Sequence, residues 1–223
     1  MQYSTALSDG ILALACLAGA LWIYRARAPF PEAERSTWFC ALLGFALPAS
    51  AALCGVLRYG LDPSWQEAHA RLSQASSLLG LPLLGIAALT LARGWAWPRI
   101  VWCWVLIGLS LLFEAAQRLS LLDDYRLLLN LVTLLLLLYV GALQLPQRAT
   151  PLLAAAAAVS LLLFAGLLVG TEGFIGPLRR VDLFHALLSL AYPLFAWLLL
   201  ALPGGSRSHA LLTEKPEKPV KTL

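Results

Sequence analysis

The chain has 223 residues, of which 60% are hydrophobic and 13% are charged, and its mean hydropathy is +0.78. A soluble domain averages about 25% charged residues, so these polar side chains are too few to cover the apolar ones in water. The formal charge of +4 comes with no aromatic-interleaved basic patch, glycine-rich phosphate loop or Walker motif, which gives no sign of nucleic-acid binding.

Seven apolar stretches divide the chain, each close to the ~20 residues with which an α-helix crosses a bilayer. They cover residues 6–24, 38–57, 76–91, 99–116, 127–145, 152–169 and 183–202. Turn and breaker residues separate them, among them Pro31, Pro63, Pro98 and Pro146. The sequence therefore predicts an all-α fold, a polytopic membrane bundle of about seven transmembrane helices over residues 1–202.

Two segments flanking these stretches have local signals of their own. The first stretch carries Asp9 near its start and has no basic residue before it, and Arg25 follows its end. We therefore expect an uncleaved anchor rather than a signal peptide. Before the third stretch, Ser64 followed by Glu67 has the spacing of a capping box and predicts a short interfacial helix that runs into the span. Residues 203–223 turn polar and basic, and we expect a disordered cytoplasmic tail.

The orientation in the membrane follows from the Lys and Arg residues of the loops. Ten of them fall in the tail and in the loops on its side of the membrane, and six fall on the other side. This distribution predicts an amino terminus outside and a cytoplasmic carboxy-terminal tail. The expected lack of a signal peptide and the compact loops favour a bacterial inner (cytoplasmic) membrane.

Few ionisable or strongly polar residues enter the spans. They are Asp9, Arg58, Glu114, Gln117, Arg118, Asn130, Asp182 and His185. In an antiparallel bundle, the starts of odd spans and the ends of even spans share one side, so all of them lie toward the same side. A charge near the hydrocarbon is costly and usually turns inward to find partners, so we expect a polar pocket at the outer end of the bundle.

Within this pocket the sequence assigns two sets of roles. Asp9, Glu114, Asp182 and His185 are the candidate catalytic residues, and Arg58, His69, Gln117, Arg118 and Asn130 are the candidate ligand-binding residues. Glu114 and Arg118 are four residues apart on one helical face and can pair directly. The alternative is that these side chains only reach the headgroups from the ends of the spans, by snorkelling.

The run Asp182-Leu183-Phe184-His185, at the start of the last of seven spans, resembles the CREST superfamily of membrane hydrolases, which includes the alkaline ceramidases. Residues 48–60 are similar to the second-span motif of bacterial relatives. The resemblance implies a seven-span fold and a zinc ion, held by one histidine of the second span and two of the last, that activates water for amide or ester cleavage.

This chain departs from that pattern at the residues that would hold zinc. Cys54 or Arg58 stands where the second-span histidine is expected, and Ser189 stands four residues after His185. His185 is the one plausible intramembrane histidine ligand, and zinc needs three or four converging ligands. Asp9, Glu114 and His69 are conceivable substitutes, so zinc stays open as a cofactor.

Three functions remain after these observations. The favoured one is a multipass membrane protein whose outer pocket binds a small molecule, a lipid or a membrane-protein partner. The second is a divergent metal-dependent lipid or amide hydrolase of the CREST type. The third is a small transporter subunit, which is disfavoured because the opposite half of the spans offers little beyond Ser50, Thr90, Gln144 and Ser160 and so no continuous polar path.

Overall fold

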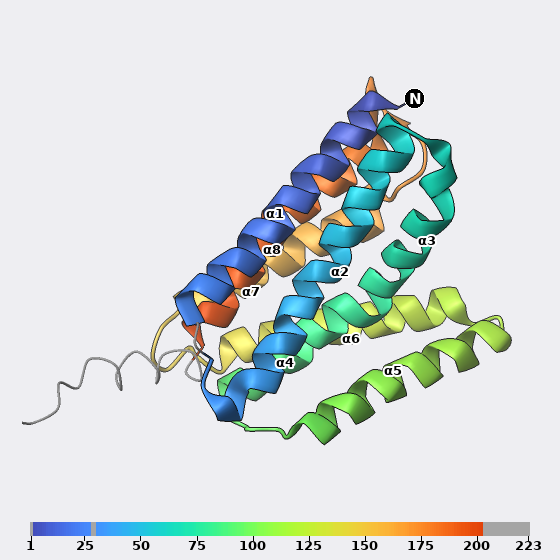
Figure 1. Cartoon of the computed structure of the whole chain (residues 1–223). Helices are drawn as coiled ribbons and strands as arrows, with labels where there is room; N and C mark the ends of the chain where they lie inside the picture. Colours follow the sequence, from blue (N-terminus) through green and yellow to red (C-terminus); the bar gives the residue numbers. More distant parts are fainter. Residues whose placement is uncertain (1, 28–29, 203–223) are drawn as a thin grey trace, which may run out of the picture.

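A computed structural model describes residues 2–27 and 30–202 of the chain (Figure 1). The tail predicted at 203–223 lies outside these residues. Seven helical segments of the described part are long and apolar enough to cross a membrane. They cover Tyr3–Ala26, Glu32–Gly60, Pro63–Arg93, Arg99–Arg118, Leu122–Ala142, Thr150–Val169 and Arg180–Ala201. This confirms the predicted all-α bundle of seven spans, the fold of a multipass membrane protein.

The helical elements follow one another with short connections. They are α1 (Tyr3–Arg27), the 3-10 turn η1 (Glu32–Glu34), α2 (Arg35–Gly60), the 3-10 turn η2 (Pro63–Trp65), α3 (Gln66–Ala75), the π-helical turn η3 (Ser76–Gly80), α4 (Leu81–Arg93), α5 (Arg99–Arg118), α6 (Leu122–Ala142), α7 (Thr150–Leu163), the π-helical turn η4 (Phe164–Val169) and α8 (Arg180–Ala201). The third span is thus one continuous run from η2 to α4, and the sixth is α7 with η4.

The helices of the bundle are arranged around α2. This helix packs against α1, α3 and α4, and α1 packs in turn against α8, although the two lie at opposite ends of the sequence (Figure 1). Helices α4, α6, α7 and α8 continue the packing, and α5 lies at the edge of the bundle beside α6. The contact between α1 and α8 brings the first and last helices together at the level of their polar residues.

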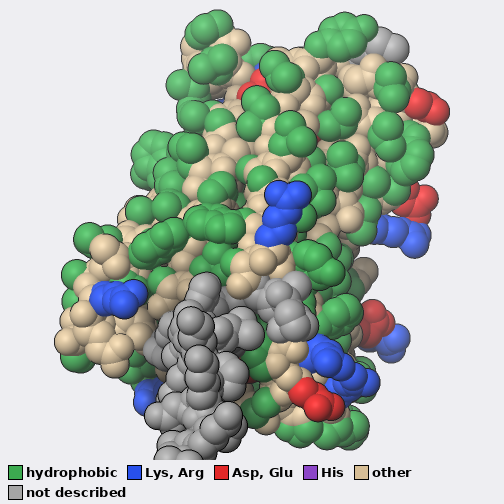
Figure 2. Space-filling view, turned by 60° about the vertical axis from the view of Figure 1, so that its left-hand side comes forward, with side chains coloured by type: hydrophobic (Ala, Val, Ile, Leu, Met, Phe, Trp, Pro, Cys, Tyr) green, Lys and Arg blue, Asp and Glu red, His purple; other side chains and the backbone are tan. Residues whose placement is uncertain are grey.

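Small residues let the helices approach closely, as is common in membrane bundles. A Cβ added to Gly44 of α2 would lie 2.5 Å from Cγ of Leu84 and 2.9 Å from the carbonyl oxygen of Gly80. The outward faces carry large apolar side chains instead, such as Leu14 and Leu135, and Figure 2 shows hydrophobic side chains over most of one face. This surface suits hydrocarbon as the surrounding solvent.

Two local features differ from the sequence-based expectation. Asp62, rather than Ser64, caps the helical run that forms the third span, because its carboxylate accepts the backbone N–H of Ser64 at 2.9 Å.

A short hairpin, β1 (Phe174–Ile175) with β2 (Leu178–Arg179), precedes α8 and was not predicted. Its two-residue loop begins at Gly176, whose φ of +58° is a conformation that glycine adopts without strain.

We expect Gly44→Ala to destabilise the bundle by about 1–3 kcal/mol, because the new methyl group overlaps Leu84 and the backbone of Gly80. Gly108→Ala is the matched control, since a Cβ there meets nothing within 4 Å. Thermal unfolding of the two variants in detergent measures the difference. Equal melting temperatures for both variants would contradict the α2–α4 packing described above.

A second prediction concerns the Asp62 cap. The hydroxyl and the backbone N–H of Ser64 donate to the Asp62 carboxylate and lower its pKa below the ordinary value of 3.8. Because the charged form is stabilised, the cap contributes at neutral pH and is lost as the pH falls through this lowered pKa. Hydrogen exchange over residues 64–66 should therefore be faster in Asp62→Ala than in the wild type at neutral pH, and the difference should vanish in acid. A difference that persists unchanged in acid would rule out the carboxylate as the cap.

Candidate functional site

Four side chains meet where α1 and α8 begin, and we call them the α1–α8 cluster: Ser8, Asp9, Asp182 and His185. Oδ1 of Asp9 lies 3.2 Å from Nδ1 of His185, and the two side chains are 1% and 11% exposed. The Ser8 hydroxyl lies 3.2 Å from the same nitrogen of His185 and 3.3 Å from Oδ1 of Asp182. The cluster thus joins the first helix to the last through side chains more than 170 residues apart.

An ionised Asp9 places the hydrogen of the His185 ring on Nδ1. Ser8 can donate to the carbonyl oxygen of Thr5, at 3.0 Å, or to Asp182, which leaves its oxygen as an acceptor. The Asp9 carboxylate is also an acceptor, so both neighbours of Nδ1 call for an N–H there. Nε2 of His185 then presents a lone pair, and no hydrogen bond to it occurs within the described residues.

Gly55 of α2 makes the position of Asp9 sterically feasible. A Cβ at Gly55 would lie only 2.2 Å from Oδ2 of Asp9 and 3.0 Å from Oδ1, so any other residue would displace the carboxylate. Oδ2 itself is buried and has no hydrogen-bond partner in the described part of the chain. The backbone of α2 at Gly55 therefore packs closely against the Asp9 carboxylate, of which only Oδ1 has a polar partner in the described residues.

Arg58 and His69, two basic residues from neighbouring helices, lie near this cluster. Arg58 of α2 acts electrostatically on Asp9, and its guanidinium lies 4.7 Å from the centre of the Tyr59 ring. His69 of α3 acts electrostatically on His185, and its Nδ1 lies 2.9 Å from the carbonyl oxygen of Ala51 in α2. Arg58 and His69 are thus the two of the five predicted ligand-binding residues that lie near the α1–α8 cluster, on α2 and α3.

The structure places the remaining predicted site residues elsewhere. Glu114 and Arg118 do pair, with Nε of Arg118 2.7 Å from Oε1 of Glu114, but both side chains are exposed on α5, as is Gln117. Asn130 is half-buried on α6, and its Oδ1 has no partner in the described part of the chain. Helix α5 packs against α6, η3 and α2 rather than against α1 and α8, so Glu114 belongs to a separate surface pair.

Sequence reasoning missed Ser8 and Gly55. A serine next to Asp9 on a helix can satisfy its hydroxyl on its own backbone, as Ser8 also does with Thr5. Gly55 resembles any small residue of a membrane helix until its distance to Asp9 is known. The available signal was only that Ser8 lies beside Asp9 in the sequence.

The side chains present do not fit a zinc ion. In the described residues, no group of three His, Cys, Asp or Glu side chains is arranged to hold a metal. Asp9 and His185 face each other rather than a common centre. Ser189, at the position where the resemblance implies a ligand, donates its hydroxyl to the backbone carbonyl of His185 at 2.8 Å.

Comparison of the chain with protein-family models, with curated proteins and with solved structures finds no match.

We expect Gly55→Ala to destabilise the protein by about 1–3 kcal/mol and to separate Asp9 from His185, because the added methyl group occupies the place of the carboxylate. Gly10→Ala is the control, since its Cβ would lie 3.7 Å from Cγ2 of Val56, an ordinary contact. Thermal unfolding gives the stability, and the ring-nitrogen NMR shifts of His185 report on the contact. Unchanged shifts in Gly55→Ala would disprove the close approach of Asp9 to Gly55.

Proposed function

We propose that this chain is a membrane protein that binds a small polar ligand, a lipid headgroup or a group of a membrane partner at the α1–α8 cluster. The positive-inside pattern of the sequence predicts that this end of the bundle faces outward. The ligand would contact Nε2 of His185 and the guanidinium of Arg58, with His69 at the margin.

The observation that carries this proposal is the buried contact between Asp9 and His185. Ionisable residues within membrane helices are expensive and tend to mark functional sites. Burying a carboxylate costs several kcal/mol unless hydrogen bonds compensate it, and Oδ2 of Asp9 remains without a hydrogen bond in the described part of the chain. A bundle built for packing alone would gain stability from an apolar side chain at this position.

The free groups indicate the chemistry of the ligand. Nε2 of His185 accepts a hydrogen bond while Nδ1 carries the ring hydrogen, and the Arg58 guanidinium can only donate. A hydroxyl or an amide group offers both a donor and an acceptor and so satisfies both residues. Since the cluster lies within the first two turns of α1 and of α8, such a group could come from the headgroup region of the bilayer.

A metal-dependent hydrolase of the CREST type is the second candidate, favoured by one feature. A carboxylate that orients a histidine and leaves Nε2 free is the arrangement of many metal-binding and general-base histidines. Ser8 does not complete a serine–histidine–aspartate relay, because Ser8 and Asp9 both contact the same ring nitrogen. The hydrolase would need further ligands that the cluster, as arranged, does not supply.

Thermal unfolding in detergent, with and without a lipid extract of the native membrane, tests the binding proposal. A ligand present at about 100 times its Kd adds about 2.7 kcal/mol, which corresponds to a rise of roughly 5–10 °C in Tm for a chain of this size. We expect this rise in the wild type and a much smaller one in His185→Gln and Arg58→Gln. Arg118→Gln, on α5, should keep the full response.

Two outcomes would overturn the proposal. An equal rise in the wild type and in both cluster variants would show that the cluster is a structural contact. About one zinc ion per purified chain, lost in His185→Ala, together with release of fatty acid or amine from the extract, would favour the hydrolase instead.

A further inference from the structure

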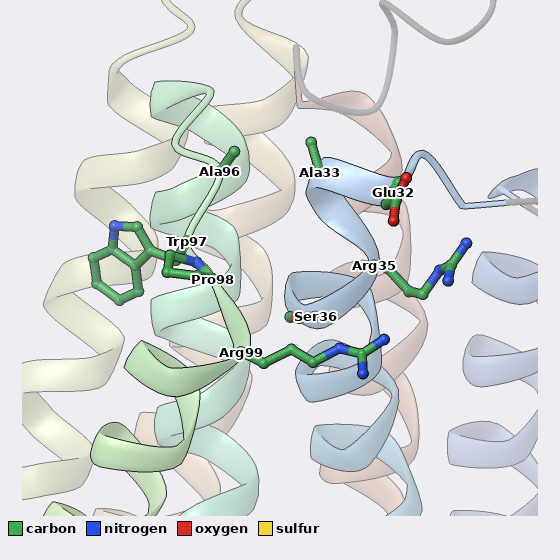
Figure 3. A pocket seen from close by; sticks show the side chains of 8 residues that line it. All are labelled: Glu32, Ala33, Arg35, Ser36, Ala96, Trp97, Pro98 and Arg99. Carbon is green, nitrogen blue, oxygen red and sulfur yellow. The ribbon is translucent and has the colours of Figure 1, made fainter.

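A second polar region lies at the opposite end of the bundle, where α2 and α5 begin. There η1, the start of α2 and the connection between α4 and α5 border an open hollow of about 460 Å³ (Figure 3). Its lining includes Glu32, Arg35, Ser36, Trp97 and Arg99. The volume falls within the range of ordinary small-molecule sites, and none of the residues predicted for the α1–α8 cluster contributes to it.

Positive charge dominates this hollow. Arg99 extends from the start of α5 toward α2, whereas Arg35 extends from α2 to the side away from α5 (Figure 3). Within the described residues neither arginine has an ion-pair partner within 4 Å, and Glu32 is the one acidic residue of the lining. Glu34 of η1 lies outside the lining and accepts the indole N–H of Trp38. Two guanidinium groups are thus left against a single carboxylate.

The backbone adds to the positive potential. Helix α5 begins at this hollow without a side chain that caps its first turn. The first N–H groups of a helix have no partner within the helix and attract anions. The start of α2 differs, because the turn η1 runs directly into it and the carbonyl oxygen of Glu32 accepts the N–H of Arg35. The arginines and the start of α5 therefore favour the same kind of ligand, an anion.

The surroundings indicate that this anion belongs to a lipid. Trp97 stacks on Trp95 with ring centroids 6.0 Å apart, and tryptophans gather at the level of the headgroups. Phe39 lies one helical turn after Arg35 on α2, and Ile100 directly follows Arg99 on α5; their side chains are 63% and 60% exposed. Each arginine therefore has an exposed apolar side chain close to it on the same helix.

We propose that this hollow binds the phosphate of an anionic phospholipid, whose acyl chains lie along Phe39 and Ile100. Guanidinium groups match phosphate oxygens with paired hydrogen bonds, and Arg35 and Arg99 supply two of them from separate helices. A soluble phosphate would use the arginines but would leave the apolar surface uncovered. This inference does not depend on the function of the α1–α8 cluster.

Native mass spectrometry of the full chain, in micelles with equal amounts of phosphatidylglycerol and phosphatidylcholine, tests this site. We expect the wild type to retain phosphatidylglycerol preferentially, by about fivefold for each arginine, and Arg35→Gln/Arg99→Gln to lose the preference. Arg35→Lys/Arg99→Lys should keep part of it, because charge remains while the planar guanidinium is lost. A thermal melt of each variant checks that it is folded.

The matched control is Arg71→Gln/Arg118→Gln, which removes the same charge from two exposed arginines at the other end of the bundle. It should bind phosphatidylglycerol as the wild type does. An equal loss in both double variants would show an effect of net charge alone, and no loss in Arg35→Gln/Arg99→Gln would remove the site. Retention of millimolar inorganic phosphate by the wild type, with displacement of the lipid, would show that the ligand is a soluble phosphate.

Discussion

The contact between Asp9 and His185 is the constraint on which the cluster end of the bundle depends. The Asp9 and His185 side chains are 1% and 11% exposed, and α1 and α8 must keep their register for the contact between them to exist. Helix α2 takes part in this contact through Gly55, because only a residue without a side chain leaves room for the Asp9 carboxylate. The Asp9 carboxylate thereby fits one arrangement of these three helices, whose apolar side chains pack together along their length.

The two ends of the bundle differ in their chemistry. The end at which α1 begins buries acidic and imidazole groups between helices, whereas the other end displays arginines and tryptophans around an open hollow. Buried groups of the first kind are suited to specific contacts with a ligand that fits between the helices. Exposed cations beside tryptophans are suited to the charged surface of a bilayer. The two proposals therefore concern separate sites in one scaffold.

The separation of Glu114 from Asp9 shows what a topological argument leaves open. Alternation of antiparallel spans places both residues toward the same side of the membrane, but it says nothing about their position around the bundle. Helix α5 lies at the edge, beside α6, so Glu114 pairs with Arg118 on an exposed surface while Asp9 meets His185 in the interior. The sequence of one segment fixes where a polar residue lies along its helix, but it does not fix which helices become neighbours in the bundle.

The sequence by itself determined the fold class, the number of spans and the position of each polar residue along its helix, because the length and hydropathy of each segment are local properties that hydrocarbon selects directly. It also predicted the pairing of Glu114 with Arg118, because residues four apart on one helix are neighbours whatever the other helices do. The sequence also placed Asp182 with Asp9 and His185, but only the tertiary structure decided that Ser8 and Gly55 surround the Asp9–His185 contact and that Arg35 and Arg99 share a hollow. Those neighbours come from helices far apart in the chain, and their meeting depends on how the small residues of all the helices pack together.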